Sequence, residues 1–415
     1  MPRREQAVLA QRTIDALAEM KDSMRGRVPA LVPLKYQRMC LSPFGYFRGA
    51  VPVMAADLAA GRHSGLFTQL CGDAHVRNLG AYAALDGRLV FDINDFDETI
   101  RGPFEWDLKR MCTSLLLAAE EAINKPGQSA TNGNGNAEDA VLCFMESYSA
   151  AIHRFAEMPV VEVARFQIHR LSKNPAVQQI FLKAERATPL HTRDTLTVVK
   201  KGKRIFREDP PVLVRLSESD AKRAIASLKS YAEHLLPERR HFLSQYRPLD
   251  VAFKVVGTGS VGWRDYCIYF EGNGKNDPLF LQIKEEPQSA YAKYLPGAPA
   301  ISEGQRVAEG QRAMQMQSDP FLGWTSFGGR DYLVRQLNDH KASIAIGELH
   351  GEVLQHYAEL AGELLARGHA RSGDALAISS YIGKSKIFAE AIAEFANQYA
   401  ERTITDWKQL CAKQS

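Results

Sequence analysis

The sequence has no cysteine arrangement that would hold a metal or a disulfide framework. Its six cysteines are scattered over 415 residues, and no CxxC pair occurs among them. A zinc ribbon needs such pairs, so the cysteine pattern argues against one. Disulfide frameworks belong to small secreted chains in oxidising compartments, and we therefore expect a protein of the reducing cytoplasm.

The sequence also lacks a long apolar run and an excess of one charge. No stretch of about 18 apolar residues occurs, which argues against a membrane span. The start of the chain, MPRREQAVLAQRTIDALAEM, has the spacing of an amphipathic helix and no apolar signal-peptide core. The 52 Lys and Arg residues and the 48 Asp and Glu residues leave a formal net charge of +4. A basic charge this diluted predicts no nucleic-acid partner, and we expect no membrane partner either.

What remains is an ordinary globular composition, with 45% hydrophobic and 24% charged residues. Alternating apolar patterns predict strands in two regions that are far apart, at residues 79–98 and from residue 250 to about 337, and a hairpin is expected at 195–209. Periodic apolar residues predict helices in most other segments, namely 5–24, 106–122, 139–186, 218–246, 302–317 and 346–415. Strands and helices segregated in this way predict an α+β fold.

The stretch FDINDFDET, at residues 91–99, crowds four acids against apolar residues. An Asp-Gly pair at 86–87, between two alternating apolar runs, predicts a two-residue hairpin turn before it. Such a turn places Asn78 opposite Asp95. Directly opposed residues have Cβ atoms roughly 4.5–5.5 Å apart, so an amide and a carboxylate would face the same point.

Asp95 and Asp97 continue the apolar face of this predicted strand, because alternate residues share a face. A carboxylate on a buried face needs a partner, and oxygen ligands of this kind suit magnesium. We therefore predict that Asn78, Asp95 and Asp97 bind Mg²⁺. The alternative is a solvated acidic loop, or an ion pair with Arg77 or Arg101.

Upstream of Asn78, the segment CGDAHVRN carries an aspartate that directly follows a glycine. This residue, Asp73, could orient or deprotonate a hydroxyl group beside a metal, which makes it a candidate catalytic base. The alternative is that Asp73 caps a turn. For His75 we expect a structural role.

A glycine motif, GTGSVG, combines Gly257, Thr258, Gly259, Ser260 and Gly262. A dinucleotide-binding fold needs a helix after such a loop, whereas the β-forming segment WRDYCIYF follows here. Strand, loop and strand are the protein-kinase form, in which the glycines cover the phosphates of a nucleotide. We therefore predict that this loop binds ATP.

The next predicted strand, LFLQIKEE, presents Lys284 near its end. In kinases a lysine at this place holds the α and β phosphates. The helix that follows offers Glu309 to orient the lysine, and we prefer it to Glu303, which lies in the first turn and can complement the helix dipole. The alternative for Lys284 is a surface lysine on a strand.

Three motifs within residues 70–115, GDAHVRN, NDFDE and EWDLKR, resemble the aminoglycoside-phosphotransferase branch of the kinase-like superfamily. The resemblance implies that Asp73 is base-like, that Asp95 binds metal and that Asp107 braces the catalytic loop from behind. Cys71 stands where the superfamily usually has histidine, at a position that mainly braces the loop. The order of the motifs also departs from the pattern, because the glycine loop here follows the catalytic loop by about 180 residues.

We interpret this reversed order as a circular permutation, which preserves packing when the original chain ends are close together. It predicts a two-lobed, kinase-like fold. Residues 1–249 and 341–415 would build a helix-rich large lobe, and residues 250–340 a small nucleotide-binding β lobe. The adenine seat is expected where the lobes join, at Arg335, Gln336 and Leu337.

Over most of the chain, the motifs SPFGYFRG, CGDAH, FDINDFDET, VVGTGSVG, LQIKEE and EGQRAMQ resemble the bacterial family catalogued as domain of unknown function 2252. That family name implies no established substrate. We expect a Mg²⁺- and ATP-dependent phosphotransferase acting on an unidentified hydroxyl-bearing acceptor, a small molecule or a protein. Nucleotidyl (AMP) transfer and a non-catalytic nucleotide-binding scaffold are alternatives, as is a metal-dependent hydrolase built on Asp73, His75 and Asp95.

Three further segments have two interpretations each. Arg48, in FGYFRG, and the basic segment KKGKR at 200–204 could contact an anionic substrate or serve structure and solvation. The polar loop at 124–138 could act as a lid or simply connect two helices.

Overall fold

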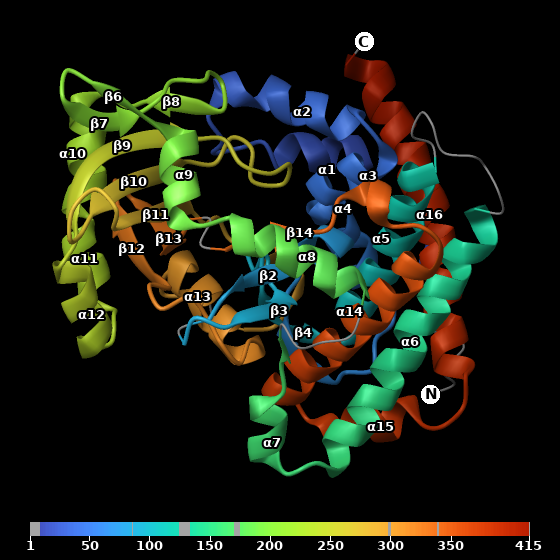
Figure 1. Cartoon of the computed structure of the whole chain (residues 1–415). Coiled ribbons are helices and arrows are strands. Elements are labelled where there is room, and N and C mark those ends of the chain that lie inside the picture. Colours follow the sequence, from blue (N-terminus) through green and yellow to red (C-terminus); the bar gives the residue numbers. More distant parts are fainter. Residues whose placement is uncertain are drawn as a thin grey trace.

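The structure is a computed structural model, and it describes residues 9–84, 86–123, 133–169, 175–297, 300–337 and 340–414. Figure 1 shows a six-stranded sheet on one side of the molecule and a body of long helices on the other. The mixture of helices and sheets confirms the predicted α+β class.

The six-stranded antiparallel sheet has the strand order β12-β13-β11-β10-β9-β8. Its strands are β8 (Leu213–Arg215), β9 (Arg247–Lys254), β10 (Asp265–Glu271), β11 (Pro278–Glu285), β12 (Gly323–Phe327) and β13 (Arg330–Gln336). Every residue of β11 is buried, because the strand lies inside the sheet and both of its faces are covered.

Segments before residue 249 supply part of the cover of this sheet. The helices α10 (Glu218–Ala226), α11 (Leu228–Glu233) and α12 (Pro237–Ser244) pack on one face, through side chains such as Tyr231. The other face receives Phe206, from the hairpin of β6 (Thr197–Lys200) and β7 (Lys203–Phe206), which follows α9 (Pro189–Leu196). The core around this sheet therefore includes residues that precede the small β lobe expected at 250–340.

Four long helices form the main core on the other side of the molecule (Figure 1). They are α5 (Glu105–Ile123), α6 (Gly133–Glu157), α14 (Gly351–Ser372) and α16 (Ile387–Gln414), and the shorter helices α7 (Val160–Arg165), α8 (Pro175–Arg186) and α15 (Ala375–Ile382) complete this body. Helix α5 is buried around most of its circumference, as a helix inside a core should be. Since α6 begins at Gly133, the expected polar loop is shorter than 124–138, and its residues 124–132 lie outside the described residues.

The N-terminal part consists of four short helices, α1 (Ala16–Asp22), α2 (Val32–Cys40), α3 (Pro43–Gly49) and α4 (Val51–Ala60). The helix expected at 5–24 is thus shorter than predicted. Asp15 caps it, because its carboxylate accepts a hydrogen bond from the N–H of Leu17 (2.9 Å). Residues 1–8 lie outside the described residues.

The acidic stretch follows a small sheet with the order β14-β2-β3-β5. Its strands are β2 (Leu79–Ala83), β3 (Leu89–Ile93), β5 (Ile168–His169) and β14 (Ala342–Ser343), and a separate pair is formed by β1 (Phe67–Leu70) and β4 (Ile100–Pro103). The predicted β2–β3 hairpin exists, but the predicted pairing of its residues is wrong by one residue. The N–H of Asn94 donates to the carbonyl of Asn78 (2.9 Å), so Asn78 lies opposite Asn94 and not Asp95.

The reason for the register error lies in the turn. The N–H of Ala84 donates to the carbonyl of Arg88 (2.8 Å), which leaves three residues in the turn instead of two. Gly87 takes a φ of +79°, a conformation that glycine adopts without the steric cost of a side chain.

Helix α13 (Glu303–Met314) lies between the six-stranded sheet and the helical body, where it contacts β12, β13, β1 and α14. Figure 1 shows it beneath the sheet and beside β2 and β3. Within the described ranges, no helix combines the length and the apolar character that crossing a bilayer requires.

Candidate functional site

The loop at residues 71–78, between β1 and β2, has a firmly held backbone. Asp107, near the start of α5, accepts hydrogen bonds from the N–H groups of Cys71 (2.8 Å) and Gly72 (3.0 Å). The hydroxyl of Tyr291 donates to the carbonyl of Gly72 (2.7 Å). The bracing contact that the resemblance implied for Asp107 is therefore present.

Asp73 lies in this loop, and one of its two carboxylate oxygens is already engaged. Its Oδ1 accepts a hydrogen bond from Nε of Arg110 (2.7 Å), a fully buried residue of α5. Its Oδ2 lies 3.6 Å from Nε2 of His75, which makes Oδ2 the oxygen open to a hydroxyl group. Sequence reasoning missed Arg110, although it follows Asp107 by three residues and so shares a helix face with it.

His75 is a buried residue of the same loop. Burial lowers the pKa of His75 to about 3, so the ring is neutral. Its Nδ1 accepts the backbone N–H of Arg77 (3.1 Å). Its Nε2 accepts a hydrogen bond from Nε of Arg48 (3.3 Å) and lies 3.6 Å from Oδ2 of Asp73. This agrees with the structural role expected for His75.

The acidic segment after β3 meets Lys284 of β11. The Nζ atom of Lys284 contacts Oδ2 of Asp97 and lies 3.8 Å from Oδ1 of Asp95. The lysine is buried, so these ion pairs join two parts of the chain far apart in sequence. Asn78, the third predicted metal ligand, donates through its Nδ2 to the carbonyl of Asp73 (2.6 Å).

Asp95, Asp97, Glu286 and Lys284 form a cluster in which each charge affects the pKa of its neighbours. Burial would raise the pKa of Asp95, but Lys284 and Arg335 outweigh it and hold that pKa well below its usual range. Burial, and after it the Asp95 carboxylate, raise the pKa of Asp97 to about 7. Burial and the nearby Asp97 likewise raise the pKa of Glu286. At neutral pH the cluster therefore carries less negative charge than its three carboxylates would suggest.

Several carboxylate oxygens here accept no hydrogen bond. Oδ1 of Asp95, Oδ1 of Asp97 and both carboxylate oxygens of Glu286 are buried and accept no hydrogen bond from any described residue. Such oxygens are costly unless a donor or a cation reaches them. Sequence reasoning missed Glu286, because an acid after Lys284 at a strand end looks like an ordinary surface residue.

These oxygens could bind magnesium only together with ligands from a bound phosphate or from water. In the part of the chain that the structure describes, no group of three or more His, Cys, Asp or Glu side chains is arranged to hold a metal ion. Magnesium, however, is usually bound by one or two carboxylates, and takes its other ligands from phosphates and water. Asp95 and Asp97 suit that mode, in which a nucleotide completes the coordination.

Three basic side chains bind the backbone of the glycine loop. Arg27, Lys35 and Arg38 all donate hydrogen bonds to carbonyl oxygens of residues 257–261, including Lys35 to Gly259 (2.8 Å). The N–H and C=O of a trans peptide point in opposite directions. The N–H groups of the same peptide units therefore point away from these cations.

The loop and the acids line one cavity of about 50 Å³. Its lining includes Arg48, Asp73, Asp97, Gly259, Ser260 and Glu286. A neighbouring cavity of about 230 Å³ shares Arg27, Glu98 and Trp263 with it. Nucleotide pockets are of the order of 300–1,000 Å³, so the cavity beside the glycine loop is smaller than a nucleotide requires.

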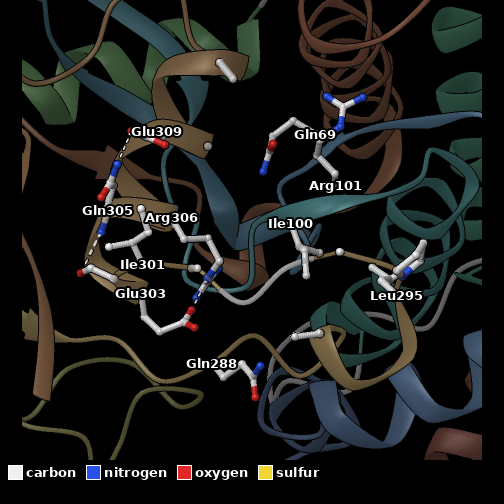
Figure 2. Close-up of a pocket in the computed structure, with 17 residues that line it drawn as sticks. Gln69, Ile100, Arg101, Gln288, Leu295, Ile301, Glu303, Gln305, Arg306 and Glu309 are labelled. Carbon is white, nitrogen blue, oxygen red and sulfur yellow. Dashed lines mark hydrogen bonds and ion pairs between the residues drawn. The ribbon is translucent and has the colours of Figure 1, made fainter.

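Glu309 does not orient Lys284, and that prediction is wrong. Its side chain is exposed, and its Oε1 accepts a hydrogen bond from Nε2 of Gln305 (2.8 Å). Figure 2 shows both residues on the wall of a separate cavity, of about 710 Å³, with Arg101 on another part of that wall. The helical period explains the error, because the buried face of α13 is set by neighbours such as Val307 and leaves Glu309 outside.

An arginine, not a glutamate, ties α13 to the acidic segment. Arg306 donates to the backbone carbonyls of Asp97 (3.0 Å), Thr99 (2.5 Å) and Pro287 (3.1 Å). A shift of this helix would therefore move the segment that carries Asp97.

The three residues expected to seat adenine make other contacts. Nη1 of Arg335 donates a hydrogen bond to the carbonyl of Asn94 (3.3 Å), in the acidic stretch at residues 91–99. The N–H groups of Gln336 and Leu337 both donate within the protein, the latter to the carbonyl of Phe280 (2.9 Å). These two backbone donors are thus not open to an adenine in this conformation.

Asp265 of β10, which pairs with Lys284 across the strands, should make stability depend on pH. Burial raises its pKa to about 6, above the ordinary value of about 3.9 in an unfolded chain. The folded protein thus holds this proton more tightly, and the stabilisation present below about pH 4 is lost as the pH rises through about 6. Asp265→Asn should remove that loss and stabilise the protein by about 3 kcal/mol at pH 8.

Urea unfolding at pH 4.5 and pH 8 measures this effect. Asp277→Asn, at an outer turn of the same sheet, serves as the comparison. Equal pH dependence in the wild type and in Asp265→Asn would contradict the assignment.

Comparison with known proteins gives one match. A family model described as "Uncharacterized protein conserved in bacteria (DUF2252)" matches residues 27–413. No curated protein and no solved structure matches the chain.

Proposed function

The chain belongs to the DUF2252 family, and we propose that it is a Mg²⁺- and ATP-dependent phosphotransferase with a permuted kinase-like, two-lobed fold. The observation that carries the proposal is the convergence of three separate motifs on one site. Asp73, Asp97 and Gly259 line one cavity, and Lys284 is paired with Asp97 beside it.

The order of elements around Lys284 supports the kinase-like part of the proposal. Strand β9, the glycine loop and β10 are followed by β11, the third strand, which carries the lysine. Protein kinases likewise place the phosphate-binding lysine on their third strand, after a glycine-rich loop. Helix α13 follows, although it supplies an arginine where the kinase pattern leads one to expect a glutamate.

The chemistry assigned to each residue is simple. Asp73 Oδ2 takes the proton of the acceptor hydroxyl, while the acceptor oxygen bonds to the γ-phosphorus. The bond from that phosphorus to the β–γ bridging oxygen breaks, and ADP leaves with the electron pair. Lys284 and the N–H groups of the glycine loop hold the phosphates. Magnesium, bound by Asp95 and Asp97, would neutralise phosphate charge.

Nucleotidyl transfer stays a second candidate for a specific reason. Arg110 engages one oxygen of Asp73, and the adenine seat expected at Gln336 and Leu337 has no open N–H group. Both observations are compatible with an ATP that binds in the inverted direction, as transfer of AMP instead of the γ-phosphoryl group would require.

Products formed from Mg·ATP distinguish these functions. We expect Mg·ATP to raise the melting temperature, because a ligand that binds only the folded state stabilises it. We expect release of γ-labelled phosphate, with water as acceptor when no other is present. Release of pyrophosphate would indicate nucleotidyl transfer, and a thermal shift without any product would indicate a scaffold. Neither a shift nor a product would reject the proposal.

A further inference from the structure

Arg48, at the end of α3, is the cation of this site that lacks an anionic or carbonyl partner. Its side chain is half-buried and lines the cavity with Asp73 and Asp97. Among the described residues, its side chain makes one hydrogen bond, from Nε to Nε2 of His75 (3.3 Å). That hydrogen bond uses only Nε, and Nη1 and Nη2 of the guanidinium have no partner among the described residues.

The other cations near the cavity are already occupied. Arg27 donates to the carbonyls of the glycine loop, and Arg110 is paired with Asp73. Lys284 is paired with Asp97, and Arg335 reaches the backbone of the acidic segment. Among these cations, Arg48 is the one whose donors are accepted by neither a carboxylate nor a carbonyl of the described residues.

The position of Arg48 indicates which anion it would meet. Asp73 and Asp95 are both close enough to act electrostatically on its charge. A Cβ atom on Gly259 would lie 3.3 Å from the backbone carbonyl of Arg48, so α3 ends directly against the glycine loop. The arginine thus stands between the base, the metal ligands and the loop, where the transferred group must pass.

We propose that Arg48 is a catalytic residue that contacts the transferred phosphoryl group and stabilises the charge of its transition state. This rests on the proposed function. In the step itself, the bond between the γ-phosphorus and the bridging oxygen breaks as the acceptor oxygen attacks, and Asp73 receives the acceptor proton. Arg48 neither gains nor loses a proton, and its fork of N–H groups binds the equatorial oxygens. An arginine supplied in this way by the same chain typically accelerates phosphoryl transfer by about 10³-fold or more.

The test compares a ground-state with a transition-state complex. Mg·ADP with aluminium fluoride imitates the planar phosphoryl group, whereas Mg·ADP alone does not. In the wild type we expect the fluoride complex to give the larger rise in melting temperature. Arg48→Ala should keep the shift with Mg·ADP and lose the extra shift with fluoride. Its phosphate release from Mg·ATP should fall about 10³-fold.

Two variants make the result specific. Arg48→Lys keeps the charge and should recover part of the extra shift, and it replaces Arg48→Ala if that variant fails to fold. Arg88→Ala, at the exposed β2–β3 turn, should match the wild type in both assays.

The possible failures can be told apart. If the wild type shows no Mg·ADP shift and no phosphate release, the proposed function is wrong and this inference falls with it. If the wild type shows both and Arg48→Ala retains the extra shift with fluoride, only the role of Arg48 is overturned. Loss of the Mg·ADP shift as well would assign Arg48 to ground-state binding, and would also overturn it.

Discussion

Replacing Lys284 with methionine should lower the free energy of unfolding by about 3–5 kcal/mol in metal-free buffer. Lys284 is buried and is the cation in contact with both Asp95 and Asp97. Without it, these half-buried carboxylates and the nearby buried Glu286 would share a site with much less positive charge. Breaking a buried ion pair by removing one partner is costly, because it leaves an uncompensated buried charge.

Magnesium should partly repair this variant. A divalent cation could bind the oxygens that Lys284 contacts, so Mg²⁺ alone should raise the melting temperature of Lys284→Met more than that of the wild type. The thermal shift with Mg·ATP should nevertheless be weaker, because a phosphate contact is lost. Urea unfolding with and without Mg²⁺ measures the first effect, and nucleotide titration measures the second.

Two controls show whether the cluster is responsible. Lys222→Met, at an exposed position of α10, should change stability by no more than about 0.5 kcal/mol. Asp97→Asn combined with Lys284→Met should recover part of the loss, because residues in contact are not additive. An unchanged unfolding midpoint in Lys284→Met would show that the ion pairs with Asp95 and Asp97 do not form.

Local patterns in the sequence were sufficient for most individual elements. Helix α5, the β2–β3 hairpin and the strands around the glycine loop each follow from apolar periodicity and turn residues within a short segment. The hairpin register failed because one more residue in the turn shifts every pair by one. The choice of Glu309 failed because which face of α13 is buried depends on packing partners that lie elsewhere in the chain.

The contacts that build the site were harder to predict, because they join segments far apart in sequence. Arg27, Lys35 and Arg38 bind the glycine loop across more than 200 residues. No periodicity marks these side chains as partners of residues 257–261. The contact between Asp97 and Lys284 has no local signal either, because 187 residues of sequence separate them.

Replacing Asp73 with asparagine should lower phosphate release from Mg·ATP by about 10²–10⁴-fold, the usual value of general base catalysis. Binding of Mg·ATP should persist, since Asp73 acts on the acceptor and not on the nucleotide. The variant should also lose stability, because Oδ1 of Asp73 is the anionic partner of the buried Arg110. Fold loss and loss of the base must therefore be separated.

The double variant Asp73→Asn with Arg110→Met separates them, because it removes both charges of the pair. Replacing both members of a buried ion pair with neutral groups is far less costly than removing one of them. We expect the double variant to unfold nearer the wild-type midpoint than Asp73→Asn does, while its single-turnover rate stays as low. A rate that returned together with stability would show that Asp73 only balances the charge of Arg110. A low rate at restored stability would assign the lost activity to the missing carboxylate, and so to Oδ2, the oxygen that Arg110 leaves open.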